Sequence, residues 1–181
     1  DDIQTVTQYY NPTGTLSTWY SGRRMGEFWG YTTRGIAKTN DEMNEHLKSN
    51  QPAWGNNWQA GDIMYKDLNG DGKVNGGAST LADHGDLRKL GYNVPRYKFG
   101  FNADVTWRDI DFSFFLQGIG RRDWFDNSPY SVGATSHGQW QSVGFKEHWD
   151  FFRPEGDPNG ANLNARFPRP LFSQGGKNMQ T

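Results

Sequence analysis

The chain has 181 residues, about the length of one domain and enough to bury a hydrophobic core. Its 19 basic and 20 acidic residues give a formal net charge of -1 with no long basic run, so we expect no nucleic-acid partner. The sequence contains no cysteine, which excludes disulfide scaffolds, thiolate zinc sites and cysteine nucleophiles.

Aromatic residues make up 15% of the sequence, although the hydrophobic class as a whole reaches only 34%. No run approaches the roughly 18 to 20 apolar residues of a membrane helix, so a helical membrane span is excluded. A membrane-spanning sheet is not excluded, because its lipid-facing residues alternate with polar ones. The chain begins with Asp1 and ends on a polar stretch, and we expect it to be part of a longer protein.

The first 36 residues are rich in Thr, Tyr, Trp and Gly, a composition typical of strands and loops. Thr39 and Glu42 then have the spacing of a capping box, in which two side chains satisfy backbone donors at a helix start. Apolar residues follow at helical spacing, so we expect a short helix over residues 40–49 that ends before Pro52.

The most specific motif lies at residues 67–75 and matches the first nine positions of a calcium-binding loop. Position 12 is Ala78, so the bidentate acid must come from elsewhere, and Asp83 and Asp86 are the nearest candidates. The alternative is a turn held by its own hydrogen bonds, and in either case the loop is expected to be rigid rather than catalytic. We predict a Ca²⁺ site formed by Asp67, Asn69, Asp71, Lys73, Asn75 and Asp86.

The strongest periodic signal runs over residues 97–107, where apolar and polar or glycine residues alternate without an error. The alternation resumes after Arg108 and Asp109. This predicts a tight β-hairpin over residues 97–120 with one apolar and one polar face. Eleven residues at about 3.3 Å span roughly 36 Å, or roughly 28 Å at a tilt of about 40°. This length is close to the ~25 Å apolar band of an outer-membrane barrel. A long amphipathic hairpin of a soluble sandwich is the alternative.

The region after the hairpin is polar, with a predicted helix over residues 142–152 and loops beyond Pro154. None of the common catalytic motifs is present, and we predict that the chain is not an enzyme. Aromatic rings in loops can stack on sugars or anchor a protein partner, although they more often pack loop against loop. The candidates for such contacts are Trp54, Trp58, Trp124 and Trp140.

Four stretches in order, residues 61–74, 86–91, 95–101 and 114–118, carry a family resemblance. They read GDIMYKDLNGDGKV, DLRKLG, PRYKFGF and FFLQG, and together they resemble the C-terminal barrel region of SusC/RagA-type TonB-dependent outer-membrane transporters. The segments GEFWGY upstream and FPRP downstream fall in the expected order, so the resemblance covers about residues 22–172.

The resemblance implies a multi-pass β-barrel of about 22 strands in the outer membrane of a Gram-negative bacterium, plugged at its N-terminal part and coupled there to TonB. It also implies a SusD-like surface lipoprotein as partner, outer-membrane lipid as surroundings, and an oligosaccharide or peptide as cargo.

We therefore predict an all-β fold, an antiparallel transmembrane β-barrel segment with long extracellular loops and short helices. Residues 1–96 would form barrel strands and a long extracellular loop with the calcium-like motif, and residues 97–120 a transmembrane hairpin. Residues 121–181 would form an extracellular loop region that leads to final strands outside this chain. The alternative function is that of a soluble calcium-stabilised glycan-binding β-module.

Overall fold

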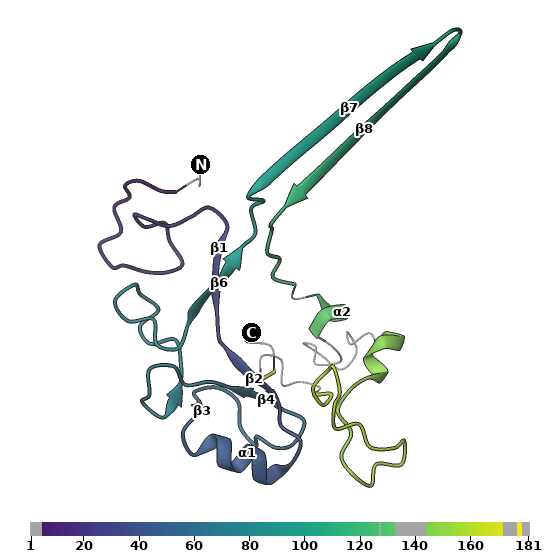
Figure 1. The fold of residues 1–181 in the computed structure, drawn as a ribbon. Helices are drawn as coiled ribbons and strands as arrows, with labels where there is room; N and C mark the ends of the chain where they lie inside the picture. Colours follow the sequence, from purple (N-terminus) through teal and green to yellow (C-terminus); the bar gives the residue numbers. More distant parts are fainter. Residues whose placement is uncertain (1–4, 127, 133–143, 172–176, 179–181) are drawn as a thin grey trace.

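The computed structural model describes residues 5–126, 128–132, 144–171 and 177–178 of the chain. The elements lie in a body at one end and in a long hairpin that projects from it (Figure 1). In chain order they are β1 (Glu27–Gly30), β2 (Thr33–Ile36), α1 (Asn40–Leu47), β3 (Gln51–Pro52), β4 (Ile63–Tyr65), β5 (Lys73–Val74), β6 (Arg88–Tyr92), β7 (Tyr97–Trp107), β8 (Ile110–Gly120), α2 (Pro129–Val132) and a 3₁₀-helix (Lys146–Trp149).

The strands of the described residues form four separate two-stranded sheets, so the predicted fold class, a segment of a transmembrane β-barrel, is wrong for this structure. Strands β1 and β6, β2 and β4, and β7 and β8 pair antiparallel, whereas β3 and β5 pair in parallel. All these sheets are open, because no strand of the described residues has neighbours on both edges. The prediction failed because alternation along a strand specifies its two faces but carries no information about the partners of its edges.

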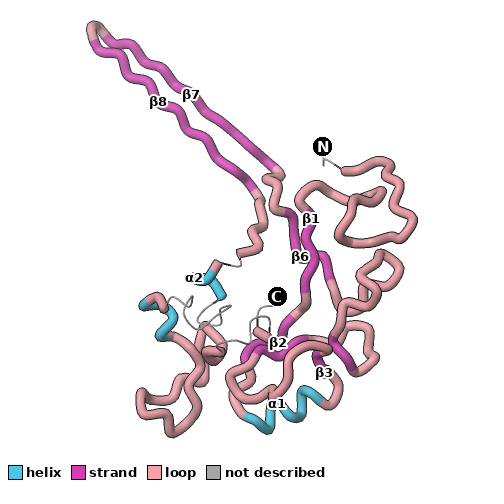
Figure 2. The backbone as a smooth tube through the Cα atoms, turned by 180° about the vertical axis from the view of Figure 1, so that it is seen from behind, coloured by secondary structure: helices cyan, strands magenta, loops and turns pink. Residues whose placement is uncertain are grey.

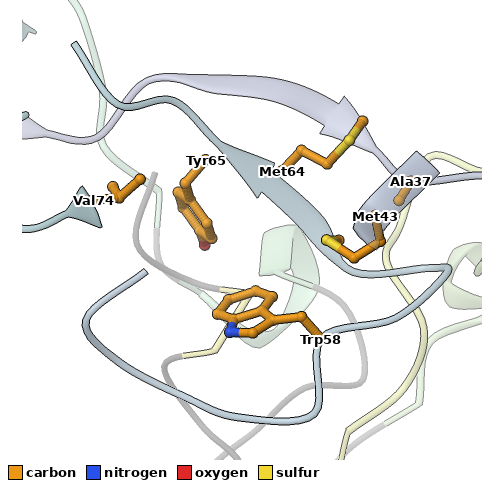
Figure 3. Close-up of a cluster of buried hydrophobic side chains, with 6 residues drawn as sticks. All are labelled: Ala37, Met43, Trp58, Met64, Tyr65 and Val74. Carbon is orange, nitrogen blue, oxygen red and sulfur yellow. The ribbon is translucent and has the colours of Figure 1, made fainter. Parts of the chain in front are cut away.

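Helix α1 begins where the sequence predicts and ends two residues earlier than expected, at Leu47. The Thr39 hydroxyl accepts a hydrogen bond from the Glu42 backbone N–H at 3.1 Å, which caps the first turn. The Glu42 carboxylate accepts from the backbone N–H of Lys38 at 2.7 Å, one residue before the cap. The helix then buries Met43 against the body (Figure 3).

The predicted helix over residues 142–152 is wrong in its described part, where only Lys146–Trp149 form one 3₁₀ turn. The chain leaves helical geometry because the backbone N–H of Phe152 donates to the carbonyl of Phe167 at 3.0 Å. Phe151 and Phe167 form an isolated bridge, so a long-range backbone pairing replaces the helix at this point.

The hydrophobic core is small and centres on the ring of Tyr65, which is fully buried (Figure 3). Trp54 and Trp58 meet this ring edge to face, with centroid distances of 5.1 and 6.0 Å. Such aromatic pairs stabilise by about 0.5 to 1.5 kcal/mol beyond the area they bury. The buried members of the cluster are Ala37, Met43, Trp58, Met64, Tyr65 and Val74, contributed by several short segments rather than one long element.

A buried carboxylate, Asp62, joins this core to the C-terminal part of the chain. Its side chain has no solvent exposure and accepts two hydrogen bonds from Arg169, at 2.7 Å from Nε and 3.0 Å from Nη2. The Lys177 ammonium lies 2.9 Å away, and the Asn178 amide donates at 3.0 Å. Two cations therefore face one anion inside the protein, a pairing that low dielectric makes strong.

The same contacts explain a requirement for glycine at position 61. Gly61 has a φ of +87°, and an added Cβ would lie 2.4 Å from the Phe152 ring and 3.0 Å from the Cβ of Arg169. The Gly61 carbonyl accepts from the backbone N–H of Arg169 at 2.9 Å. Close approach of these two backbones brings the guanidinium to Asp62.

Burial raises the Asp62 pKa, but hydrogen bonds from Arg169, Asn178 and Lys177 lower it more, so the pKa lies below its ordinary 3.8. A folded-state pKa below the unfolded one adds stability above the unfolded value, and this stability is lost as pH falls through the folded value. We expect Asp62→Asn to lower the free energy of unfolding at pH 7 by about 3 to 5 kcal/mol, because it leaves buried cations unpaired. Urea unfolding of both proteins at pH 7 measures the stability that the variant loses. The same measurement below pH 4 shows how much of this stability the parent loses in acid.

The exposed acid Asp109 offers a matched control, since it lies in the hairpin turn and away from the core. Asp109→Asn should leave the unfolding free energy within about 0.5 kcal/mol of the parent. An Asp62→Asn variant with unchanged stability and unchanged acid sensitivity would contradict the role given to this carboxylate.

Candidate functional site

The calcium-like loop is held by hydrogen bonds between its own side chains and backbone. The Asp67 carboxylate accepts from the backbone N–H of Gly70 at 2.6 Å and of Gly72 at 2.7 Å. Asn69 Oδ1 accepts from the Asp71 N–H at 3.0 Å, and Asp71 Oδ1 accepts from the Lys73 N–H at 2.8 Å. These are successive Asx turns, the local geometry that Asp and Asn favour.

Hydrogen bonding also sets the charge of Asp67. Slight burial raises its pKa, but the N–H donors of Gly70 and Gly72 lower it more, so the pKa lies below its ordinary value and the carboxylate is charged at neutral pH. Both glycines have a φ of +81°, which side-chain-bearing residues rarely adopt. The turns at residues 67–73 therefore follow from residues that are close together in the sequence.

Asp86, predicted as the last metal ligand, is instead used by the backbone of the loop. It is fully buried, and its Oδ1 accepts from the N–H of Leu68 at 2.6 Å and of Asn69 at 3.2 Å. Its Oδ2 accepts from the N–H of Asn75 at 2.9 Å. One carboxylate thus ties the two ends of the loop together from the inside.

The remaining residues of the predicted set are similarly engaged. Asn75 Oδ1 accepts from the Gly77 N–H at 2.7 Å, and Lys73 begins β5, which pairs with β3. Asp83, the other acid considered, accepts from the Ala78 N–H at 3.0 Å. Within the described ranges, no group of three or more His, Cys, Asp and Glu side chains is placed to hold a metal ion. The oxygen-rich composition suits Ca²⁺, but the arrangement matches a self-bonded turn, and calcium binding stays a prediction.

Asp86→Asn should loosen the loop, because an amide group would face backbone N–H donors that the second carboxylate oxygen now satisfies. A buried donor left without a partner costs about 1 to 3 kcal/mol, and we expect a loss of stability in this range. Hydrogen exchange should become faster at the amides of Leu68 and Asn75. The exposed neighbour Asp83 gives the control, since Asp83→Asn should affect only the adjacent turn; equal protection in all three proteins would exclude the anchoring role.

Calcium binding is tested by thermal unfolding in metal-free buffer and with added CaCl₂. A bound ion stabilises the folded state by mass action, so the prediction is a higher melting temperature with calcium. The double variant Asp67→Ala with Asp71→Ala should remove the increase. Identical melting of the parent chain in both buffers would leave only the turn held by its own hydrogen bonds.

The four candidate tryptophans lie in different environments. Trp58 is buried, and Trp54 is half-buried between Tyr31 and the core, with a centroid distance of 4.7 Å to Tyr31. Trp124 is 66% exposed, and the Arg122 guanidinium lies 4.7 Å from its ring centroid. Trp140 lies outside the described residues. Of the described three, Trp124 therefore offers an open ring to a ligand, whereas Trp54 and Trp58 support the core.

The hairpin of β7 and β8 is present with the bounds that alternation predicts, and Arg108 and Asp109 form its turn. Opposite residues of an antiparallel pair lie on the same face. The register pairs Trp107 with Ile110 at the turn and Tyr97 with Gly120 at the base, so one face is apolar or glycine along its whole length. Its large side chains are Tyr97, Phe99, Phe101, Val105, Trp107, Ile110, Phe112, Phe114 and Leu116.

This apolar face is open, because the hairpin projects away from the body in both views (Figures 1 and 2). Phe99 is 63% exposed and Trp107 62% exposed. The Phe99 ring covers Gly118 on the partner strand, where an added Cβ would lie 2.2 Å from it. The opposite face is polar except for Phe115 and Ile119, as the alternation predicts.

Neither a protein-family model nor a curated protein matches the chain. The resemblance to SusC/RagA-type transporters therefore rests on the residues quoted for it. In the part of the chain that the structure describes, no helix is long and apolar enough to cross a membrane.

Proposed function

We propose that this chain is part of a TonB-dependent outer-membrane nutrient importer, with the apolar face of hairpin β7–β8 in contact with lipid. The observation that carries the proposal is this continuous apolar face, which the body does not cover. Contiguous exposed apolar patches beyond a few hundred Å² mark sites of protein or membrane contact.

The free energy available from this contact is large. Burying a Val, Leu, Ile or Phe side chain contributes about 1.5 to 3 kcal/mol. Phe112, Ile110 and Leu116 are each about 60% exposed, so roughly half of that contribution remains for each. Summed over the nine large side chains of the face, this amounts to on the order of 10 kcal/mol. This free energy is comparable to the whole free energy of unfolding of a small domain.

Length and end residues favour lipid over a protein groove. Each strand has eleven residues, which at about 3.3 Å per residue matches the apolar thickness of an outer membrane when tilted. Tyr97 at the base and Trp107 at the turn place amphipathic rings where the two interfaces would lie.

The cargo and partners follow from the family resemblance. The body, with its rigid loop at residues 67–75 and the exposed Trp124, would lie outside the cell beside a SusD-like lipoprotein. The cargo would be an oligosaccharide or a peptide, and TonB would drive its passage. Passage would depend on binding and gating, without covalent chemistry.

The alternative, a soluble calcium-stabilised glycan-binding module, has less support from the geometry. Two of its four candidate tryptophans, Trp54 and Trp58, pack in the core, and the calcium-like loop is closed by its own hydrogen bonds. The module would also leave the hairpin face in water, where exposed aromatic area promotes aggregation.

The neighbouring residues Phe112 and Ser113 test the proposal, because they lie on opposite faces of β8. We expect the parent chain to require detergent and to float with vesicles of phosphatidylethanolamine and phosphatidylglycerol. Phe112→Asp should reduce flotation several-fold, since a charge on a lipid face is destabilising, by about 2 to 4 kcal/mol for Arg or Lys at the midplane and by less for Asp. Ser113→Asp should change it little.

A parent chain that is monodisperse in buffer and does not float would exclude lipid contact and favour the soluble module. Equal loss of flotation in Phe112→Asp and Ser113→Asp would show that the two faces are equivalent, which the proposal forbids. Far-UV circular dichroism of each variant checks that the fold is retained.

A further inference from the structure

An open cavity of about 340 Å³ lies in the body, in the region of α1, β2 and β4, and neither the core nor the hairpin accounts for it. Figure 1 shows these three elements together at the end of the body farthest from the hairpin. The volume is at the lower end of the range typical of small-molecule sites, about 300 to 1,000 Å³. Its lining residues are Arg34, His46, Asn50, Lys66 and Asp67.

A β-bulge places Arg34, one of the two cations of this cavity. The β2–β4 register pairs Thr33 with Tyr65 and Gly35 with Met64, so Arg34 is an extra residue without an opposite partner. Bulges redirect a side chain out of the regular alternation. The Lys66 N–H donates to the Thr32 carbonyl at 2.9 Å, which continues the pairing past the bulge and brings Lys66 beside the same cavity.

The two neutral polar side chains of the cavity, His46 and Asn50, are held by hydrogen bonds. His46 Nε2 lies 2.7 Å from the Tyr65 carbonyl, to which the neutral ring donates. Burial, together with the nearby Arg34 charge, lowers the His46 pKa below its ordinary 6.5, so the ring is neutral at pH 7 although Glu42 and the Tyr65 carbonyl act in the other direction. Asn50 accepts from the Asp67 N–H at 2.8 Å and donates to the His46 carbonyl at 3.1 Å.

The charges of the cavity do not cancel. Asp67 contributes one negative charge, but its oxygens already accept the N–H groups of Gly70 and Gly72. No hydrogen bond or ion pair joins the side chain of Arg34 or Lys66 to another residue of the described ranges. Two free cations and a net positive charge in a concave site select an anion, and a guanidinium fork matches a carboxylate in two parallel hydrogen bonds.

We propose that this cavity binds the carboxylate of a small ligand, either an acidic sugar or the C-terminal carboxylate of a peptide, through Arg34 and Lys66. The inference deepens the proposed function and depends on it for the biological role, since oligosaccharides and peptides are the cargo proposed for the importer. Binding itself can be measured whether or not the hairpin contacts lipid, so the two proposals can fail separately.

The test is isothermal titration of the detergent-solubilised full chain, in buffer freed of divalent metal so that no ion bridges to Asp67. The probes are trigalacturonic acid and trialanine, with neutral maltotriose and trialanine amide as matched ligands without the carboxylate. We expect saturable binding of one or both acids, no binding of the neutral ligands, and weaker binding at higher salt.

Arg34→Gln and Lys66→Gln should each weaken binding of the acidic probe by about tenfold, the usual effect of one charge-assisted hydrogen bond. Both side chains are exposed, so these variants are expected to fold. Lys98→Gln removes the same charge from the polar face of the hairpin and should leave the affinity unchanged.

The response to the two acids identifies the source of the carboxylate, sugar or peptide. Absence of saturable binding for both probes would overturn the proposal, as would equal loss in the Arg34, Lys66 and Lys98 variants. Acid binding retained in a chain that fails to float with vesicles would sustain the cavity proposal and reject only the membrane role.

Discussion

The buried carboxylate of Asp62 is the constraint on which the body depends. A charge without solvent exposure must find partners inside the protein, and Asp62 finds them in Arg169 and Asn178, 107 and 116 residues later in the chain. Lys177 also faces Asp62, and its backbone carbonyl accepts a hydrogen bond from the Tyr65 hydroxyl at 3.2 Å. The ion cluster and the aromatic core are therefore closed by the same C-terminal residues, and neither is complete without them.

The body and the hairpin are stabilised in different ways. The body has short strands, a small aromatic core and buried charges, so its stability comes from contacts between distant segments. Hairpin β7–β8 consists of two strands that pair with each other, with exposed side chains on both faces. An isolated two-stranded hairpin is only marginally stable in water, so the proposed contact of its apolar face with lipid would add to its stability.

The proposed carboxylate cavity and the calcium-like loop share the carboxylate of Asp67. The residue lines the cavity, and its oxygens accept the glycine N–H groups that shape the loop. A substitution of Asp67 would therefore affect both the loop and the cavity.

The sequence by itself determined the features with short-range causes. The capping residues Thr39 and Glu42 fixed the start of α1, the alternation fixed both faces and the turn of the hairpin, and glycines fixed the loop at residues 67–75. Only the tertiary structure decided that the sheets are open, that Asp86 serves the loop backbone, and that Trp58 packs in the core. The reason is physical: local patterns specify which face of a residue is apolar and which turn it can form, whereas edge partners, buried ion pairs and the bulge that exposes Arg34 depend on segments that are distant along the chain or on the register between them.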